Sequence, residues 1–220
     1  TVFLQLIVMV MSFAPIGVFC LIGKFVIADG LDIFQDVLAY VVLLISLLIF
    51  HALFTYSIFL KFIGGLSPIT FFKKIKNVAL FAFSTSSSAA TIPVTLKTVN
   101  QDLGVNQNVA SFVVPVGATI NMDGTAIMQG LATVFIAQMS GIDLTLFQYG
   151  QVVLLAVATS IGTAAVPSAG TITLIIILQQ FNLPLEAIGI ILAVDRVLDM
   201  IRTSVNVTGD AAIACIVAKS

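Results

Sequence analysis

Five residues near the end of the chain have side chains that could bind charged solutes. Asp195, Asp199, Arg202, Asn206 and Asp210 are separated by 4, 3, 4 and 4 positions. At about 3.6 residues per turn, an α-helix places them within an arc of roughly 80° on one face. The other positions of this segment are mostly Ile, Leu, Val, Ala and Met. The pattern predicts a polar stripe on an otherwise apolar helix.

The stripe holds more acid than base, with three carboxylates beside one guanidinium. Charged side chains at membrane depth are costly and therefore face protein, water or ligand. Arg202 suits bidentate binding of a carboxylate, and Asp199 on the same face could accept an ammonium group. Together they indicate an acidic amino acid, and the surplus acid indicates a cation. An internally paired network that only locks helices together is the alternative.

A second set of oxygen ligands lies at Asn121 and Asp123, inside the segment 117–125. Oxygen ligands without a His or Cys cluster favour a hard cation. Sodium fits a mostly carbonyl site better than calcium, which takes more carboxylates. Asp123 could instead cap a helix break, since Asp is common beside such turns.

Composition indicates an all-α integral membrane protein. Of 220 residues, 60% are hydrophobic and 9% are charged, whereas soluble domains are about half apolar and a quarter charged. The formal net charge of −1 gives no basic field for nucleic acid. Because the chain starts with threonine and its first apolar run begins at once, we expect it to be part of a longer protein.

Two apolar runs, 2–25 and 38–63, are long enough for single spans. The residues between them, 27–35, are expected to form a polar turn. Lysines at 73, 74 and 76 follow the second run and predict a cytoplasmic connection. We therefore expect two transmembrane helices in 1–68 and a transport core in 69–220.

The predicted core is interrupted three times. Short apolar arms at 78–83 and 89–97 flank a polar break at 84–88, and 152–178 repeats this design around 160–170. Such arms are too short to span a bilayer, so each pair predicts a re-entrant hairpin. Between them, 108–138 predicts a helix unwound at 117–125, and 185–217 predicts one long helix. Paired interruptions in two halves are typical of inverted-repeat carriers with the site between them.

The serine run 86–88 is a weak candidate for nucleophilic catalysis. A nucleophilic serine needs a base within reach, and the only histidine, His51, is remote in sequence. His51 is better explained as a satisfied polar residue in a helix bundle. We expect no enzyme activity, and a hairpin tip whose backbone N–H groups bind an anion. The same holds for 166–170, where Gly170 permits close approach of a ligand to the backbone.

These motifs resemble the glutamate transporters of the sodium:dicarboxylate (dicarboxylate/amino acid:cation) symporter family. The resemblance covers the last-helix segment 199–210, the broken helix at 121–125, and the tips at 86–95 and 162–170. The segment 14–19 also fits the helix two before the first hairpin. The four motifs occur in the family's order.

The resemblance implies roles for individual residues. Arg202 would pair with the substrate side-chain carboxylate and Asp199 with its amino group. The polar shell around the substrate would comprise Thr203, Asn206 and Thr125, carbonyls of Ser86 and Val166, and Ser88 and Gly170 holding the α-carboxylate.

Sodium sites follow from the same resemblance. One would use Gly117, Asn121, Asn206 and Asp210. Another would use backbone oxygens of Thr119, Ser160, Ile161 and Thr163. A third would use Asn121 and Asp123 with partners from an earlier helix. The family is trimeric and moves its transport domain like an elevator, with the second hairpin as the extracellular gate.

Three positions depart from the family pattern. Gln129 stands where potassium-coupled animal members carry an acid, which leaves sodium symport as the expectation and proton or potassium coupling open. Ala89 and Ser168 replace other small residues, so we expect only tuning.

The leading hypothesis is therefore a multi-pass sodium-coupled symporter of the cell membrane for aspartate or glutamate. A dicarboxylate or cystine carrier of the same family is the nearest alternative, although Asp199 would repel a dianion that lacks an ammonium group. An intramembrane aspartyl protease would need two facing aspartates, one of them protonated; Asp123 and Asp210 are the candidates, but their oxygen-rich surroundings favour ionisation. An anion channel and a pure binding fragment are further alternatives.

Overall fold

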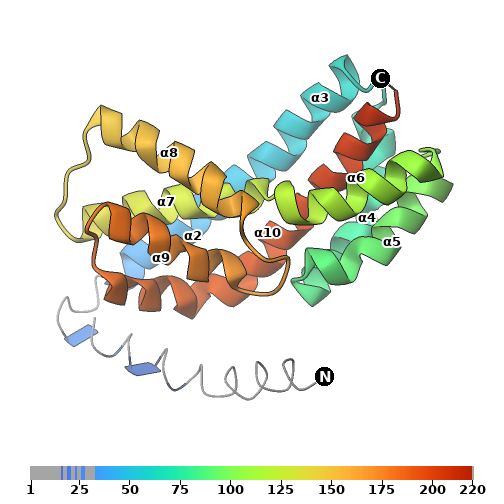
Figure 1. Ribbon diagram of the computed structural model, residues 1–220. Coiled ribbons are helices and arrows are strands. Elements are labelled where there is room, and N and C mark those ends of the chain that lie inside the picture. Colours follow the sequence, from blue (N-terminus) through green and yellow to red (C-terminus); the bar gives the residue numbers. More distant parts are fainter. Residues whose placement is uncertain (1–15, 17–18, 21–22, 24–25, 28–32, 220) are drawn as a thin grey trace.

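The computed structural model describes residues 33–219 and, before them, 16, 19–20, 23 and 26–27 (Figure 1). The expected first span at 2–25, the motif at 14–19 and most of the expected turn at 27–35 therefore lie largely outside the described residues. Every element with bounds in the described part is a helix.

The first long helix combines α2 (Ile33–Phe50), a π-helical turn (His51–Thr55) and α3 (Tyr56–Phe62). Within the described residues, this helix of 30 residues is the one that is long and apolar enough to cross a membrane. The prediction of a polar turn at 27–35 was wrong for its last three residues, because residues 33–35 are helical. Ile33 is buried, and Asp36 in the first turn interacts favourably with the helix N-terminus.

The first hairpin consists of α4 (Pro68–Thr85) and α5 (Ser88–Gln101), which pack against each other. Its break is shorter than the predicted 84–88, because only Ser86 and Ser87 interrupt the helices. The hydroxyls of Ser84 and Thr85 donate to carbonyls four residues earlier, at 2.9 and 3.1 Å, and both residues belong to α4. Ser86, at φ 51°, ends α4 in a left-handed conformation.

The broken helix consists of α6 (Gln107–Ile120) and α7 (Asp123–Met139). Only Asn121 and Met122 lie between them, inside the predicted unwound segment 117–125. The second hairpin consists of α8 (Leu146–Ile161) and α9 (Ala169–Gln180), joined by residues 162–168. This connection is longer than the tip of the first hairpin.

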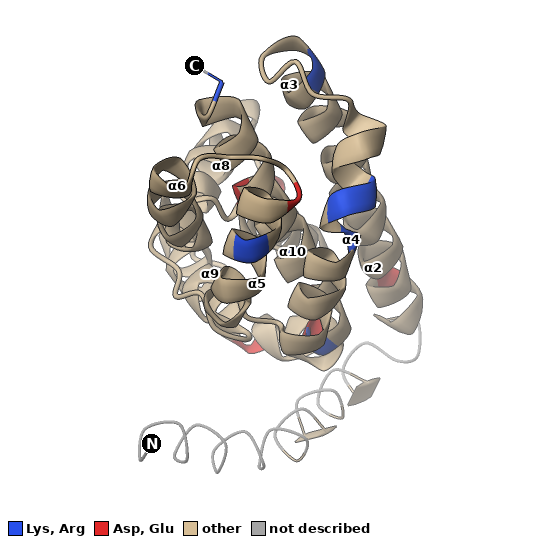
Figure 2. Cartoon of the chain, turned by 90° about the vertical axis from the view of Figure 1, so that its right-hand side faces the viewer, with Lys and Arg blue, Asp and Glu red and all other residues tan. Residues whose placement is uncertain are grey.

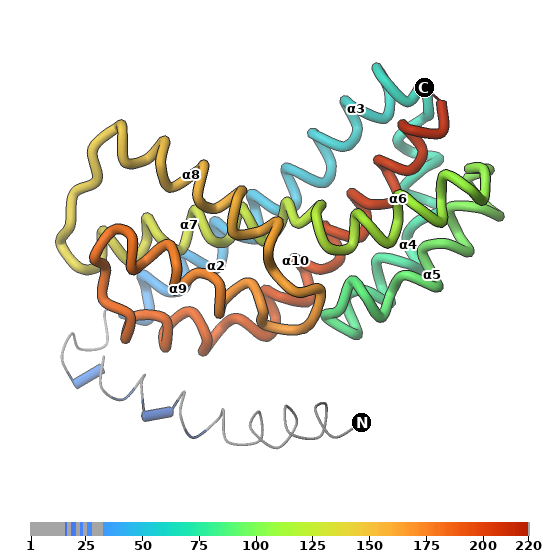
Figure 3. Tube along the Cα trace, viewed as in Figure 1, coloured from blue at the N-terminus to red at the C-terminus, as the bar shows by residue number. Residues whose placement is uncertain are grey.

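The last helix, α10 (Ile188–Val217), follows a short 3-10 turn (Leu185–Ala187) and matches the predicted 185–217. It packs against α2, α4, α5, α6, α7 and α9, and Figures 1 and 3 show it running obliquely to the C-terminus beside α3. Most of the chain in Figure 2 carries no charge. The central position of α10 places its polar stripe among the two hairpins and the broken helix.

Candidate functional site

The polar stripe of α10 is buried, and Arg202 lies at its centre with 1% of its surface exposed. Its Nη2 donates to Asp199 Oδ1 at 2.6 Å, and its Nη1 donates to Asp195 Oδ1 at 3.2 Å. These bonds use two of the five guanidinium N–H groups. The sequence placed Asp195 in the stripe without a role, and the structure makes it the second partner of Arg202.

The N-terminal end of α9 is bonded to the same two carboxylates. The backbone N–H of Ser168 donates to Asp199 Oδ2 at 3.0 Å, and Thr171 Oγ1 donates to Asp195 Oδ1 at 2.7 Å. Asp195 Oδ2 is buried and has no hydrogen-bond partner. The second hairpin is therefore tied directly to the charged groups around Arg202.

The tips of the two hairpins meet beside this centre. Ser87 Oγ donates to the Ala165 carbonyl at 2.9 Å, across 78 residues of sequence. Ser86 and Ser88 are both buried, and Ser86 Oγ has no hydrogen-bond partner. A buried hydroxyl without a partner costs about 1–3 kcal/mol, so Ser86 is well suited to contact a polar ligand.

Two of the remaining candidate substrate residues differ in how far they are exposed. Thr203 is buried within α10, whereas Val166 is 49% exposed in the second tip. Gly170 is packed tightly, because a Cβ there would lie 2.7 Å from a methyl carbon of Thr125. The structure thus joins both tips, α7 and α10 around Arg202, with Val166 at the edge.

The broken helix and α10 bring the first expected cation set together. Asn121 Nδ2 donates to Asp210 Oδ1 at 3.0 Å and to the Asn206 carbonyl at 3.4 Å. Asn206 Oδ1 accepts the Gly124 backbone N–H at 2.7 Å. At Gly117, an added Cβ would lie 2.6 Å from Asp210 Oδ1. The two chain segments therefore meet at Asn121, Asn206 and Asp210, and Gly117, the fourth residue of this set, lies beside Asp210.

Asp123 does not cap the helix break, which was the alternative raised for it. Its Oδ2 lies 3.1 Å from His51 Nε2 and accepts the Tyr56 hydroxyl at 3.0 Å. The same hydroxyl lies 3.2 Å from the Val205 carbonyl, so the two acceptors share its single hydrogen. The expectation that His51 is a satisfied polar residue is confirmed, but its partner was not foreseen.

The second expected cation set lies at helix ends. Thr119 is in the last turn of α6, Ser160 and Ile161 end α8, and Thr163 follows them. Helices α6 and α8 are in contact, and Figure 1 draws these two ends near each other. Because the last carbonyls of a helix lack intrahelical partners and carry partial negative charge, such ends are favourable for cations.

Among the described residues, no group of three or more His, Cys, Asp or Glu side chains gathers closely enough to hold a metal ion. A cation at these places would therefore use amide and carbonyl oxygens together with single carboxylates. This donor set suits a hard monovalent cation better than zinc or calcium.

Gln129, a departure from the family pattern in sequence, forms a polar junction in the structure. Its Nε2 donates to the Gly170 carbonyl at 3.0 Å and to Thr173 Oγ1 at 2.7 Å, and its Oε1 accepts Thr159 Oγ1 at 2.8 Å. The side chain thus joins α7 to both arms of the second hairpin. Its position one helical turn after Thr125 was the available signal.

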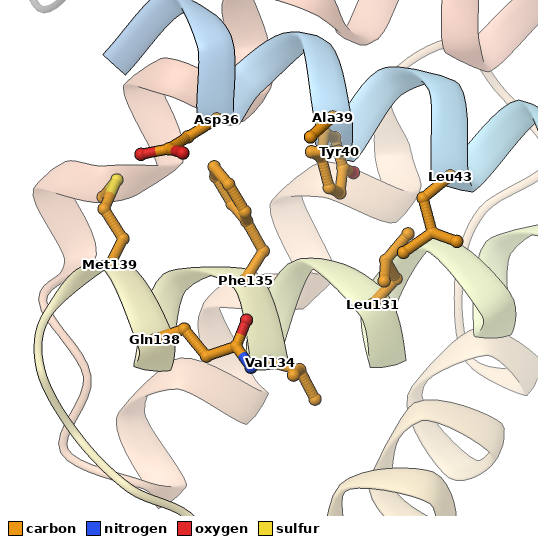
Figure 4. Close-up of a pocket in the computed structure, with 9 residues that line it drawn as sticks. All are labelled: Asp36, Ala39, Tyr40, Leu43, Leu131, Val134, Phe135, Gln138 and Met139. Carbon is orange, nitrogen blue, oxygen red and sulfur yellow. The ribbon is translucent and has the colours of Figure 1, made fainter. Parts of the chain in front are cut away.

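A cavity of about 530 Å³ lies apart from this polar centre, between α2 and α7. Figure 4 shows Asp36 and Met139 near one end and Leu43 and Leu131 near the other. Tyr40 lines the cavity, and its buried hydroxyl has no hydrogen-bond partner. No candidate site residue lines this cavity.

The family model described as "Sodium:dicarboxylate symporter family" matches residues 1–220. The chain belongs to this family. It is therefore part of a membrane transporter family, and its relatives are named as transporters rather than as enzymes.

Relatives in animals are similar over nearly the whole chain. An excitatory amino acid transporter of Caenorhabditis elegans is 42% identical over 96% of this chain and 42% of its own length. Excitatory amino acid transporter 2 of Homo sapiens is 42% identical over 94% of this chain and 36% of its own length. Excitatory amino acid transporter 1 of Homo sapiens is 39% identical. The chain thus spans less than half the length of these relatives.

Proposed function

We propose that the chain is the transport core of a sodium-coupled symporter for an acidic amino acid, aspartate or glutamate. The names of its relatives support this class of solute, and the family description supports sodium coupling. The protein acts in the cell membrane as a multi-pass protein, and its substrate and sodium cross together.

The buried pairing of Arg202 with Asp199 is the observation that carries the proposal. A guanidinium at 1% exposure with spare N–H groups suits the side-chain carboxylate of the substrate. Asp199 lies beside it and suits the substrate ammonium. The proposed shell adds Ser86, Ser88, Thr125, Val166, Gly170, Thr203 and Asn206.

Coupling to sodium is supported by the excess of acid around this centre. The centre holds four buried or half-buried carboxylates, which are those of Asp123, Asp195, Asp199 and Asp210. Among the described residues, Arg202 is the only buried or half-buried Arg or Lys beside them. We assign sodium to three oxygen sets, which are Gly117, Asn121, Asn206 and Asp210; Thr119, Ser160, Ile161 and Thr163; and Asn121 with Asp123.

The larger architecture belongs to the same proposal. The two helical pairs would be re-entrant hairpins related by an inverted repeat, because both interrupt the membrane segment at matching places. Residues 1–68 would supply two transmembrane helices and 69–220 the moving core. Trimer formation and elevator movement would depend on scaffold segments of the full-length protein.

Uptake of radiolabelled aspartate into proteoliposomes containing the full-length protein tests the proposal. We expect uptake driven by an inward sodium gradient and none with potassium in its place. Arg202→Cys should abolish uptake, whereas Arg196→Cys, on the exposed side of the same helix, should retain it.

Four outcomes separate the alternatives. Succinate transported as well as aspartate would indicate a dicarboxylate carrier, and cystine transport would indicate the other family alternative. Equal uptake in potassium would refute sodium coupling. Unchanged aspartate uptake by the Arg202→Cys variant would refute the site.

A further inference from the structure

The long apolar helix Ile33–Phe62 contains one turn of π-helix, His51–Thr55. The backbone N–H of Tyr56 donates to the His51 carbonyl, which is the five-residue spacing of a π-helix. Such single turns are rare and often lie at functional sites. We therefore asked which side chains this π-helical turn brings together.

The π-turn changes which side chains share a face. In a regular α-helix, residues five apart point about 140° away from each other. Here the five-residue hydrogen bond brings Tyr56 over His51, and the two rings meet edge to face, with centroids 4.8 Å apart and planes at 73°. Both polar groups consequently point toward the same side of the helix, where α7 begins.

Both side chains meet the same oxygen of Asp123. His51 Nε2 and the Tyr56 hydroxyl lie 3.1 and 3.0 Å from Oδ2. Among the described residues, no other polar group bonds the Asp123 side chain, so Oδ1 is left to other partners. The Tyr56 hydroxyl also lies 3.2 Å from the Val205 carbonyl of α10, so two acceptors share its single hydrogen.

We propose that His51 and Tyr56 are positioning residues that aim the Asp123 carboxylate at its cation, and that the π-turn exists to bring them together. The inference rests on the proposed function only in taking Asp123 as a sodium ligand. With a hydrogen on Nε2, the His51 ring donates to Oδ2 beside the Tyr56 hydroxyl. The carboxylate then presents Oδ1 in a fixed direction.

A packing role for His51 predicts a different result from a positioning role. A ring that only fills space is replaced best by another ring, such as phenylalanine. A donor that orients a carboxylate is replaced best by a side chain with an N–H at a similar reach, such as glutamine. The two variants therefore distinguish the two roles at one position.

The test measures the sodium concentration for half-maximal aspartate binding to the purified full-length protein. A hydrogen bond to an ionised group is worth roughly a tenfold change in affinity or more. We expect His51→Phe and Tyr56→Phe each to raise the half-saturating sodium concentration by about tenfold, and His51→Gln to stay within about threefold of wild type. Aspartate affinity at saturating sodium should be unchanged in all three.

Ser46→Ala is the matched control, because this polar residue of the same helix bonds only the Val42 carbonyl, at 2.7 Å. It should behave as wild type. In an Asp123→Asn background, the His51 substitutions should add little further effect, as expected for groups that act through one carboxylate.

Wild-type sodium dependence in His51→Phe, or equal loss in the Phe and Gln variants, would overturn the positioning role. Loss of folding in one variant leaves the other two to decide. Failure of the proposed function would look different, because wild-type protein would then bind aspartate without sodium or not at all.

Discussion

A single methyl group at Gly117 should weaken sodium binding by disturbing Asp210. A Cβ at this position would lie 2.6 Å from Asp210 Oδ1, whereas real Cβ contacts essentially never fall below 3.0 Å. The Cβ is fixed by the α6 backbone, so the carboxylate must rotate. Rotation breaks its 3.0 Å hydrogen bond from Asn121 Nδ2.

The size of the effect follows from that bond. A hydrogen bond to a charged group contributes about 1.5–3 kcal/mol, which corresponds to roughly a 10- to 150-fold change in affinity. We expect Gly117→Ala to raise the half-saturating sodium concentration for aspartate binding within this range. Aspartate affinity at saturating sodium should change little, because the bonds of Arg202 do not involve this carboxylate.

Calorimetric titration of sodium in the presence of aspartate measures the effect directly. Gly130→Ala is the control, since a Cβ there would meet nothing within 4 Å. Thermal unfolding of both variants checks that the fold is intact. If Gly117→Ala bound sodium as tightly as Gly130→Ala, Asp210 would not be a ligand in the geometry described.

Three further substitutions test other contacts. Gln129→Glu should make aspartate uptake rise as pH falls. An ionised carboxylate repels the Gly170 carbonyl, to which the Gln129 amide donates at 3.0 Å, whereas a protonated one can donate again. Uptake measured between pH 5 and 8 checks this. Ser87→Ala removes the 2.9 Å bond to Ala165 and should speed aspartate release several-fold, from a loss of about 1 kcal/mol, as measured by stopped flow. Gly209→Ala places a Cβ 2.6 Å from two polar atoms and should lower the melting temperature, unlike Gly150→Ala, whose Cβ would meet nothing within 4 Å.

The sequence predicted the elements of the core because their signals are local. The spacing of Asp195 to Asp210 placed the stripe on one face, and the structure buries all of it. The break at Asn121 was equally visible from polar residues between glycines. The predicted tip of the first hairpin, 84–88, was too long. Side chains such as those of Ser84 and Thr85 can end a helix or hydrogen-bond to a carbonyl of its previous turn, and sequence alone does not distinguish the two.

The pairings inside the site could not be predicted, because they join distant parts of the chain. His51 and Asp123 are 72 residues apart, and periodicity within one helix gives no information about its partner. The π-turn was hidden for a related reason. Nothing in residues 52–55, three apolar side chains followed by Thr55, distinguishes a π-turn from an α-turn. The shared face of His51 and Tyr56 therefore became visible only in three dimensions.

The two carboxylates beside Arg202 differ in how much bonding capacity they retain. An ionised carboxylate offers about four lone-pair sites. On Asp199, Arg202 uses one oxygen and the Ser168 N–H uses the other. A substrate ammonium could therefore join Asp199 while both existing bonds remain.

Asp195 is arranged differently, because Thr171 and Arg202 both bond its Oδ1, and Oδ2 has no partner. A substrate carboxylate that draws the guanidinium away would leave Asp195 held by Thr171 of α9 alone. The bond from Arg202 to Asp195 is also the longer of its two, at 3.2 against 2.6 Å. Under the proposed function, the bond from Arg202 to Asp195 is therefore the one that breaks more readily. Because Asp195 also accepts the Thr171 hydroxyl, breaking it would directly change the bonding of the second hairpin.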